Sequence, residues 1–275
     1  MTNLPLPTPA RRAAGARVST RAVGILGGMG PAAGADFVRL FVQAWSELLQ
    51  ARGLPVTDQS FPEHWLVQLP VPDRSAALDA EIPGRDGPFL AMAAGLAKLQ
   101  AVGVQAAAIA CNTAHAWHAA LRARCPAIEL LHAPREVASL LRAAGVREAA
   151  LLATQGTYRA GLYEAALARE GIACHLPDEA ARQTLMRGIY AGVKAGDLPL
   201  AQAAFVEVGR GLLGRHGDIP LIMGCTEIPL GLAPAPEAAR WDLVNPGRVL
   251  AQALARRAWV GCEDLDASPS HGALP

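Results

Sequence analysis

The sequence predicts an α/β fold built from two similar three-layer α/β/α subdomains, each with a mainly parallel sheet between layers of helices. Short apolar runs of strand length alternate with helical periodicity along most of the 275 residues, which is typical of parallel sheets covered on both faces. Two patterns also occur twice: GILGGMG has a counterpart in LLATQGT, and IACNT has one in IMGCT. Two such units related by a pseudo-twofold axis would face each other across one cleft.

The first half of the chain alternates strands and helices with clear stop signals. We expect strands at 21–30, 64–72, 104–110 and 127–133, because each is a short apolar run and the first ends in glycines. We expect helices at 33–53, 87–103, 112–125 and 135–145. Apolar residues recur at steps of three and four in the first helix, and Gly53 and Gly103 end the first two.

The second half repeats this order of elements. Strands are expected at 148–154, 172–177 and 219–224, and helices at 157–171, 178–196, 199–217 and 247–261. In open parallel sheets, ligands bind outside the carboxyl ends of the strands. Each unit would therefore offer the cysteine that follows one of its strands, Cys111 or Cys225, to the same cleft.

The composition is that of a globular protein, and it argues against several classes of function. Apolar residues make up 52% of the chain, charged residues 18%, and the net charge is +1, so no basic field indicates a nucleic-acid partner. No apolar run is long enough to cross a bilayer, so we expect no membrane association. The first residues lack the apolar stretch of a secretory signal, which predicts a cytoplasmic protein.

We expect four regions along the chain. Residues 1–20 are predicted to be a disordered lead-in, and residues 263–275 a loose tail. Residues 21–132 together with 245–262 would form the first subdomain, and residues 133–244 the second. The helix in VNPGRVLAQALARRAW would be the segment that returns to the first subdomain.

Five cysteines are present, at positions 111, 125, 174, 225 and 262, and none lies in a C-x-x-C pair. Their odd number and the expected reducing compartment argue against structural disulfides, and their spacing does not indicate a zinc site. Cys111 and Cys225 each stand at a strand-to-helix junction, where free N–H groups lower a thiol pKa. Either one alone is as readily a small buried apolar residue, but two in matching contexts favour a pair of acid/base thiols.

Polar residues near these cysteines indicate a carboxylate ligand. Asn112, Thr113 and Thr226 bring side-chain donors and backbone N–H groups to the two junctions. Arg74 either donates a pair of hydrogen bonds to a carboxylate or is an ordinary surface arginine. Lys194 is one of only two lysines in the chain, and it is either functional or part of a solvated helix face.

Other candidates have weaker signals. The glycines of GGMG, Gly28 among them, let the backbone approach a ligand, but the pattern is not the G-x-G-x-x-G of a dinucleotide site. Thr154 and Thr157 occupy the equivalent position in the second half, at the end of a strand, and are placed to donate hydrogen bonds to a ligand. His115 and His118 share one helix face, but without a third ligand they do not indicate a metal site.

The motifs GILGGMGP, VPDRSAA, ACNTAH, LLATQGTYRAGLYEAAL, IYAGVKAGD and MGCTEIPL together resemble the aspartate/glutamate racemase family, over a stretch from about Ala22 to about Val260. ACNTAH and GCTEIPL are the specific motifs among them. The resemblance implies two α/β subdomains of like fold facing across a cleft, and racemisation of amino acids without pyridoxal phosphate, another cofactor or a metal. It also implies a homodimer.

The resemblance further implies roles for individual residues. Cys111 and Cys225 would be the two catalytic acid/base groups, one removing the α-proton and the other supplying a proton on the opposite face. The implied substrate-binding residues are Met29, Arg74, Asn112, Thr113, Thr154, Lys194 and Thr226, with Arg74 and Lys194 toward the acidic side of the substrate. The implied supporting residues are Gly28, Gln68, His115, Thr157 and Glu227, the last of which either orients the cysteine or interacts with the loop.

Three functions stay open at this point. The first is a racemase of aspartate or glutamate, which the PDRS sequence around Arg74 favours by its resemblance to aspartate-type members. The second is a broad-specificity amino-acid racemase, or an isomerase of a small dicarboxylate similar to maleate isomerases. The third is a protein that binds carboxylates without catalysis. The partner is in each case a small amino acid or dicarboxylate, and exchange of its α-proton in heavy water separates the three.

Overall fold

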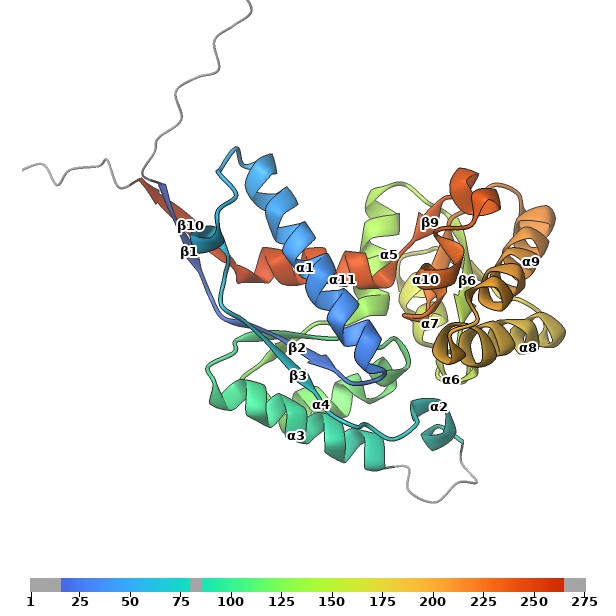
Figure 1. Cartoon of the computed structure of the whole chain (residues 1–275), viewed down its shortest axis with the longest axis horizontal. Helices are drawn as coiled ribbons and strands as arrows, with labels where there is room; N and C mark the ends of the chain where they lie inside the picture. Colours follow the sequence, from blue (N-terminus) through green and yellow to red (C-terminus); the bar gives the residue numbers. More distant parts are fainter. Residues whose placement is uncertain (1–15, 80–85, 265–275) are drawn as a thin grey trace, which may run out of the picture.

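The computed structural model describes residues 16–79 and 86–264 and contains two four-stranded parallel sheets (Figure 1). The first consists of β2 (Val23–Gly27), β3 (His64–Gln68), β4 (Ala106–Ile109) and β5 (Glu129–Leu130), in the order β3-β2-β4-β5. The second consists of β6 (Glu148–Ala153), β7 (Ala173–His175), β8 (Leu221–Gly224) and β9 (Leu243–Val244), in the order β7-β6-β8-β9. Both sheets thus share one topology, which confirms the predicted α/β class with two like units.

Helices cover both faces of each sheet. The first half contains α1 (Pro31–Ala51), α2 (Arg74–Ala77), α3 (Gly87–Ala101) and α4 (His118–Arg124). The second half contains α5 (Ala133–Ala143), α6 (Gln155–Arg159), α7 (Leu162–Arg169), α8 (Glu179–Arg187), α9 (Leu198–His216), α10 (Ile228–Leu232) and α11 (Pro246–Ala258). Within the described ranges, no helix combines the length and the apolar character that crossing a bilayer requires.

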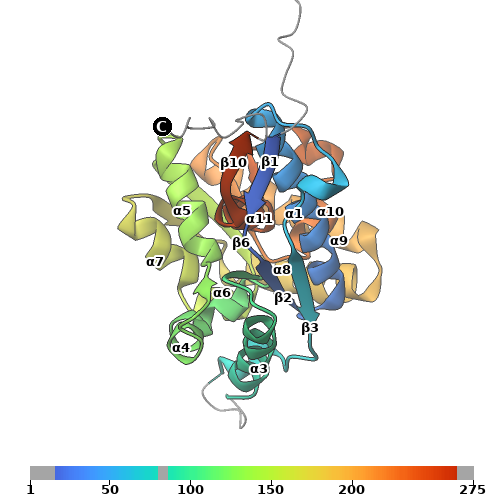
Figure 2. The ribbon, with the colours of Figure 1, turned by 90° about the vertical axis from the view of Figure 1, so that its left-hand side faces the viewer.

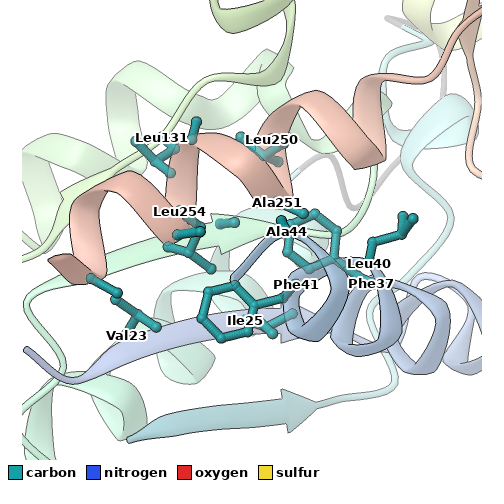
Figure 3. Packing of buried hydrophobic residues seen from close by; sticks show 14 of the residues in the cluster. Val23, Ile25, Phe37, Leu40, Phe41, Ala44, Leu131, Leu250, Ala251 and Leu254 are labelled. Carbon is teal, nitrogen blue, oxygen red and sulfur yellow. The ribbon is translucent and has the colours of Figure 1, made fainter. Parts of the chain in front are cut away.

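The first sheet packs on two sets of helices because its strands are apolar on both faces. Val23 and Ile25 of β2 lie against α1 and α11, where Phe41 and Leu254 complete the cluster (Figure 3). Leu26 points to the opposite face, into the cluster that includes α3 and α4. Successive residues of a strand point to opposite faces, so one strand serves both layers. Burying a side chain of this size stabilises the fold by about 1.5–3 kcal/mol.

The second sheet is built in the same way. Leu152 and Met223 pack with residues of α8, α9 and α10 on one face. Leu151 and Ile222 pack with residues of α5 and α7 on the other. Each half is therefore a three-layer α/β/α unit.

The chain ends differ from the sequence expectation. Residues 16–20, expected in the disordered lead-in, form β1 (Ala16–Thr20), which pairs antiparallel with β10 (Trp259–Asp264) beside it (Figure 2). The helix expected through residue 261 ends at Ala258, and Trp259 packs against Trp45 with 6.1 Å between ring centroids. Local sequence patterns cannot reveal these two strands, since each has its partner at the other end of the chain. The remainder of the lead-in and of the tail lies outside the described residues.

Two expected helices are interrupted. The helix expected at 157–171 divides into α6 and α7 at Gly161, which has a φ of 57°. The helix expected at 178–196 continues from α8 as a π-turn, Gly188–Gly192, and a 3-10 turn, Val193–Ala195. Gly192 lies so close to α9 that a Cβ atom there would be 2.7 Å from the Cβ of Ala201. This close approach fixes the irregular turn that carries Lys194.

The short elements α2, α10 and β9 were not expected from the sequence. Strands of the first sheet span residues 23–130 and strands of the second span residues 148–244. After β9 the chain enters α11, which packs on the first sheet beside α1. The predicted subdomain boundary near residue 133 and the return near residue 245 stay predictions.

Candidate active site

The loops after the inner strands β2, β4, β6 and β8 line one common cavity, at the sheet edge where ligands of open parallel sheets bind. It is lined by all the predicted catalytic and substrate-binding residues, Met29, Arg74, Cys111, Asn112, Thr113, Thr154, Lys194, Cys225 and Thr226, and also by Asp73, Ser75, Tyr190 and Glu227. Its volume is about 20 Å³, which is room for roughly one water molecule. An amino acid therefore enters only when the walls of the cavity separate.

Cys111 follows β4, and backbone contacts fix its surroundings. The Nδ1 atom of His115 lies 3.0 Å from the carbonyl oxygen of Cys111 and 3.1 Å from that of Asn112. Because both partners are acceptors, Nδ1 carries the proton and donates it. Burial raises the pKa of the Cys111 thiol, while Arg74 and the N–H of Ala114 favour the thiolate and offset part of that rise.

Cys225 follows β8 and has a carboxylate for a neighbour. Its thiol donates a hydrogen bond to Oε2 of Glu227 across 2.9 Å. The hydroxyl of Thr226 donates to the same oxygen at 2.9 Å, and Nζ of Lys194 pairs with Oε1 at 2.8 Å. Burial and the Glu227 carboxylate both raise the pKa of Cys225, well above the usual value of a thiol.

The expectation that the strand-to-helix junctions lower the thiol pKa values is wrong. Cys111 is 7% exposed and Cys225 is 6% exposed, so desolvation outweighs the nearby N–H groups at both sites. The element that follows Cys111 is a short 3-10 turn, Thr113–Trp117, whose dipole is weaker than that of a long helix. The side chains beside each sulfur, rather than helix dipoles, distinguish the two thiols.

Asn112 is oriented by a residue that the sequence argument missed. The hydroxyl of Tyr163, a fully buried side chain on α7, donates to Oδ1 of Asn112. Because Oδ1 is the acceptor, the amide presents Nδ2 as the donor that is left for a ligand. The two residues are 51 positions apart, and no local pattern in the sequence pairs them.

Three threonine hydroxyls join the two halves beside the cavity. The Oγ1 atoms of Thr113, Thr154 and Thr157 lie 2.9, 3.0 and 3.1 Å from one another. Each hydroxyl has one proton to donate, so a closed triangle uses all three donors. Thr157 is fully buried and does not line the cavity. A carboxylate bound at Thr113 or Thr154 would turn one hydroxyl out of this triangle.

Arg74 is held at the cavity by carbonyl oxygens. Its guanidinium donates to Met29 at 3.0 Å, to Val71 at 3.1 Å and to Pro72 at 3.0 Å. Among the residues that the structure describes, it forms no ion pair with a carboxylate. Its charge is therefore left to pair with a ligand or with the neighbouring sulfur.

Gly28 and Gln68 shape the turn next to Met29 and do not line the cavity. Gly28 has a φ of 91°, and a Cβ atom there would lie 2.0 Å from the carbonyl oxygen of Leu69. Oε1 of Gln68 passes so close to Gly34 that a Cβ atom on that glycine would be 2.4 Å away. Both residues act on the shape of the backbone turn.

Helix α2 supplies Arg74 and Ser75 to the lining of the cavity and lies below α6 in Figure 1. The hydroxyl of Tyr190 donates to Oδ2 of Asp73 at 3.4 Å, and Arg159 forms an ion pair with Asp79 at 3.3 Å. A Cβ atom on Gly156 would lie 2.7 Å from Oγ of Ser75. These contacts hold α2 and the residues beside it against the second half. Asp73 and Ser75 lie in VPDRSAA and Tyr190 lies in IYAGVKAGD, but none of the three was predicted as a site residue.

The predicted pair of histidines is joined by a third, and none of them lines the cavity. The rings of His115, His118 and His132 have centroids 4.6 to 6.3 Å apart. Burial lowers the pKa of His115 to about 4 and that of His132 to about 2. The described part of the chain contains no group of three His, Cys, Asp or Glu side chains that could hold a metal ion.

The architecture and the two cysteine motifs agree with one known family. The profile of the family described as Asp/Glu/Hydantoin racemase matches residues 26–254, most of the chain. The chain belongs to this family. Membership in the Asp/Glu/Hydantoin racemase family supports an isomerase that acts on a small amino acid.

Solved structures of racemases have the same fold as this family member. The chain is similar to Picrophilus torridus aspartate racemase, with 26% identity, a TM-score of 0.69, and coverage of 86% of this chain and 93% of that one. A putative Asp/Glu racemase from Yersinia pestis has the same fold at 22% identity, with a TM-score of 0.69 and coverage of 86% and 98%. An uncharacterized protein in the pnlA 3' region of Pectobacterium carotovorum subsp. carotovorum is 33% identical over 114 residues, 42% of this chain and 74% of that protein.

Proposed function

We propose that this racemase-family protein interconverts the enantiomers of aspartate or glutamate without a cofactor, with Cys111 and Cys225 acting on opposite faces of the α-carbon. One observation carries the proposal: the two cysteines follow equivalent strands, β4 and β8, of two like sheets and line one cavity. Inverting a stereocentre requires removal of a proton from one face and delivery of another to the opposite face. Two acid/base groups on opposite walls of a cavity meet that requirement.

The proposed step conserves protons and electrons. The Cys111 thiolate takes the α-proton, and the electron pair of the broken C–H bond remains on the α-carbon and its carboxylate. The Cys225 thiol gives its proton to the opposite face and becomes a thiolate, and the roles reverse for the other enantiomer. The α-proton of an amino acid is far less acidic than a thiol, so donors to the carboxylate must stabilise the carbanion-like state. The free Nδ2 of Asn112 is such a donor.

The charges of the cavity support an acidic substrate. Lys194 is paired with Glu227 at 2.8 Å, whereas Arg74 has no carboxylate partner within the described residues. The guanidinium of Arg74 is therefore available to the second carboxylate of aspartate or glutamate. The similarity to an aspartate racemase at 26% identity also favours this choice.

A screen in heavy water tests the proposed function. Each of the nineteen chiral L-amino acids of proteins is incubated with the protein, and the loss of the α-proton signal is followed by NMR. Maleate is incubated in the same way, and its conversion to fumarate is followed. We expect exchange and racemisation with aspartate or glutamate. Turnover of maleate to fumarate without exchange of aspartate would indicate a dicarboxylate isomerase. Tight binding of carboxylates with no exchange at any pH would indicate a binding protein.

Single substitutions test the two-base assignment. Cys111→Ala and Cys225→Ala should each abolish racemisation while the circular dichroism spectrum of the fold is kept. Cys125→Ala is a matched control, because Cys125 is also buried but does not line the cavity. A Cys111→Ala or Cys225→Ala protein that racemises at the parent rate would show that the assignment is wrong.

The homodimer and the cytoplasmic location stay predictions. Analytical ultracentrifugation tests the first: a dimer sediments with twice the mass of the 28.7 kDa chain. Fractionation of the cells that make the protein tests the second.

A further inference from the structure

The two cavity cysteines have neighbours of opposite charge. Arg74 lines the same cavity as Cys111, and its positive charge favours the Cys111 thiolate. Cys225 donates instead to the Glu227 carboxylate, 2.9 Å away. Both charges belong to the protein, so the asymmetry exists before any substrate enters.

Glu227 is a buried carboxylate that three donors hold in place. It is 7% exposed and accepts from the Cys225 thiol at 2.9 Å, from the Thr226 hydroxyl at 2.9 Å and from Nζ of Lys194 at 2.8 Å. Burial acts to raise the pKa of Glu227, but the hydrogen bonds from Cys225 and Lys194 lower it overall. Glu227 is therefore ionised, and the shared proton stays on the Cys225 sulfur.

We propose that the Glu227 carboxylate, which Lys194 holds in place, keeps Cys225 in its thiol form between turnovers, and that Cys111 is the base of the resting enzyme. A thiolate at Cys225 would place two negative atoms in contact, which is unfavourable in a buried site. A thiolate at Cys111 would instead face a guanidinium. Glu227 is then a positioning residue, and Lys194 acts through Glu227 rather than as a ligand of the substrate. This assignment rests on the proposed racemase function.

The asymmetry adds a step to the catalytic cycle. After Cys111 has taken the α-proton and Cys225 has given up its own, the enzyme holds a thiol beside Arg74 and a thiolate beside Glu227. A proton then leaves Cys111 for solvent and another returns from solvent to Cys225, with no net change in protons and no electron transferred. The enantiomer that requires Cys225 as the base meets the less populated form of the enzyme.

Several other groups face the two sulfurs. The groups that act on Cys225 are Glu227, Cys111, Lys194, Tyr163 and Tyr190, and those that act on Cys111 are Arg74, Glu227 and Cys225. Burial raises the pKa of both tyrosines, so neither carries a charge near neutral pH. Glu227 therefore differs from the rest in being a negative charge in direct contact with one sulfur only.

Thiolate absorbance in the ultraviolet measures the ionisation of each sulfur without requiring turnover. The difference between the parent protein and Cys111→Ser gives the titration of Cys111, and the difference from Cys225→Ser gives that of Cys225. We expect the Cys111 thiolate to form at the lower pH. In Glu227→Gln, the Cys225 thiolate should form about one to three pH units lower than in the parent. Glu227→Asp should restore part of the shift, and Lys194→Met should move the Cys225 titration upward.

Glu148→Gln provides a matched control for the charge change. Glu148 is an exposed carboxylate that pairs with His175 and does not line the cavity, so its loss should leave both titrations unmoved. Two thiolates that form at the same pH, or a Cys225 thiolate that forms first, would overturn the proposal. So would an unchanged Cys225 titration in a folded Glu227→Gln protein. If that variant does not fold, the order seen with the two serine variants decides.

Lys194 has a separate kinetic test. If Lys194 acts through Glu227, Lys194→Met adds no further increase in the KM for aspartate to the Glu227→Gln protein. If Lys194 binds the substrate carboxylate, the increase persists in that background, and this part of the proposal fails. A protein that orders its thiols as expected but racemises no amino acid contradicts the proposed function alone. A working racemase with the reverse order contradicts only the inference drawn here.

Discussion

Replacing Tyr163 with Phe removes one hydroxyl from a side chain that is completely buried. That hydroxyl is the donor to Oδ1 of Asn112, so the variant leaves a buried acceptor without its partner. Loss of the partner costs about 1–3 kcal/mol. The Asn112 amide can recover only by rotating, which turns Nδ2 away from the substrate. A shift of the reacting groups by about 1 Å reduces the rate by about a hundredfold, so we expect a loss of activity of up to that size.

Tyr158→Phe is the matched control for this experiment. The Tyr158 hydroxyl is also buried, but it donates to the carbonyl oxygen of Leu151 at 3.0 Å and accepts from the N–H of Ala153 at 2.8 Å, away from the cavity. Its loss should cost a similar 1–3 kcal/mol, roughly, in the free energy of unfolding. It should leave kcat/KM of the folded protein near that of the parent.

Urea unfolding and racemisation kinetics separate the two effects. Both tyrosine variants should unfold at lower urea concentrations, and only Tyr163→Phe should lose activity while folded. Asn112→Ala should be equally impaired, and the double variant with Tyr163→Phe should be no worse than Asn112→Ala alone. If the two tyrosine variants lose equal activity, or the losses at Tyr163 and Asn112 simply add, the hydroxyl does not act by orienting the amide.

Three further predictions concern the wall, the specificity and the stability of the protein. Gly156→Ala places a Cβ atom 2.7 Å from Oγ of Ser75. It should therefore cost about 1–3 kcal/mol in unfolding free energy and slow racemisation. Gly214→Ala, with no atom within 4 Å of its Cβ, should do neither. Arg74→Met should raise the KM for aspartate roughly tenfold to a hundredfold, because a charge-assisted hydrogen bond is lost. It should also abolish the preference for aspartate over asparagine. Equal effects on both amino acids in steady-state assays would place Arg74 at the α-carboxylate. The pKa of His115 is lowered from 6.5 to about 4 in the folded protein, so the unfolded chain binds an extra proton between these values. His115 should therefore contribute a loss of about 1.4 kcal/mol of stability per pH unit as the pH drops through this window, in addition to the loss from His132. In urea titrations His115→Gln should show a smaller slope than the parent, and an equal slope would contradict this.

The positions of the two cysteines could be predicted because each is a local feature. Each of Cys111 and Cys225 ends a short apolar run and is followed by a polar residue, and the carboxyl ends of inner parallel strands meet at one edge of the fold. The duplication of one α/β unit was likewise visible in the paired motifs. Local patterns thus indicated the sheets and the residues after the strands that line the cavity.

Features that depend on contacts between distant segments could not be predicted. Tyr163 reaches Asn112 across 51 positions, and β1 pairs with β10 from the opposite end of the chain. The π-turn before Lys194 packs Gly192 against α9, a contact that periodicity does not reveal. The direction of the thiol pKa shifts was mistaken for the same reason, since burial depends on what covers a sulfur rather than on the junction that carries it.

The central claim is that one group removes the α-proton and a different group supplies its replacement. The most direct test incubates protiated L-aspartate with the protein in heavy water and stops the reaction at low conversion. Mass spectrometry of the separated enantiomers should find deuterium at the α-carbon of the new D-aspartate and protium in the remaining L-aspartate. Protium retained in the D-product, or deuterium in unreacted L-aspartate at the same early time, would mean that a single base handles both faces, and the account would be contradicted.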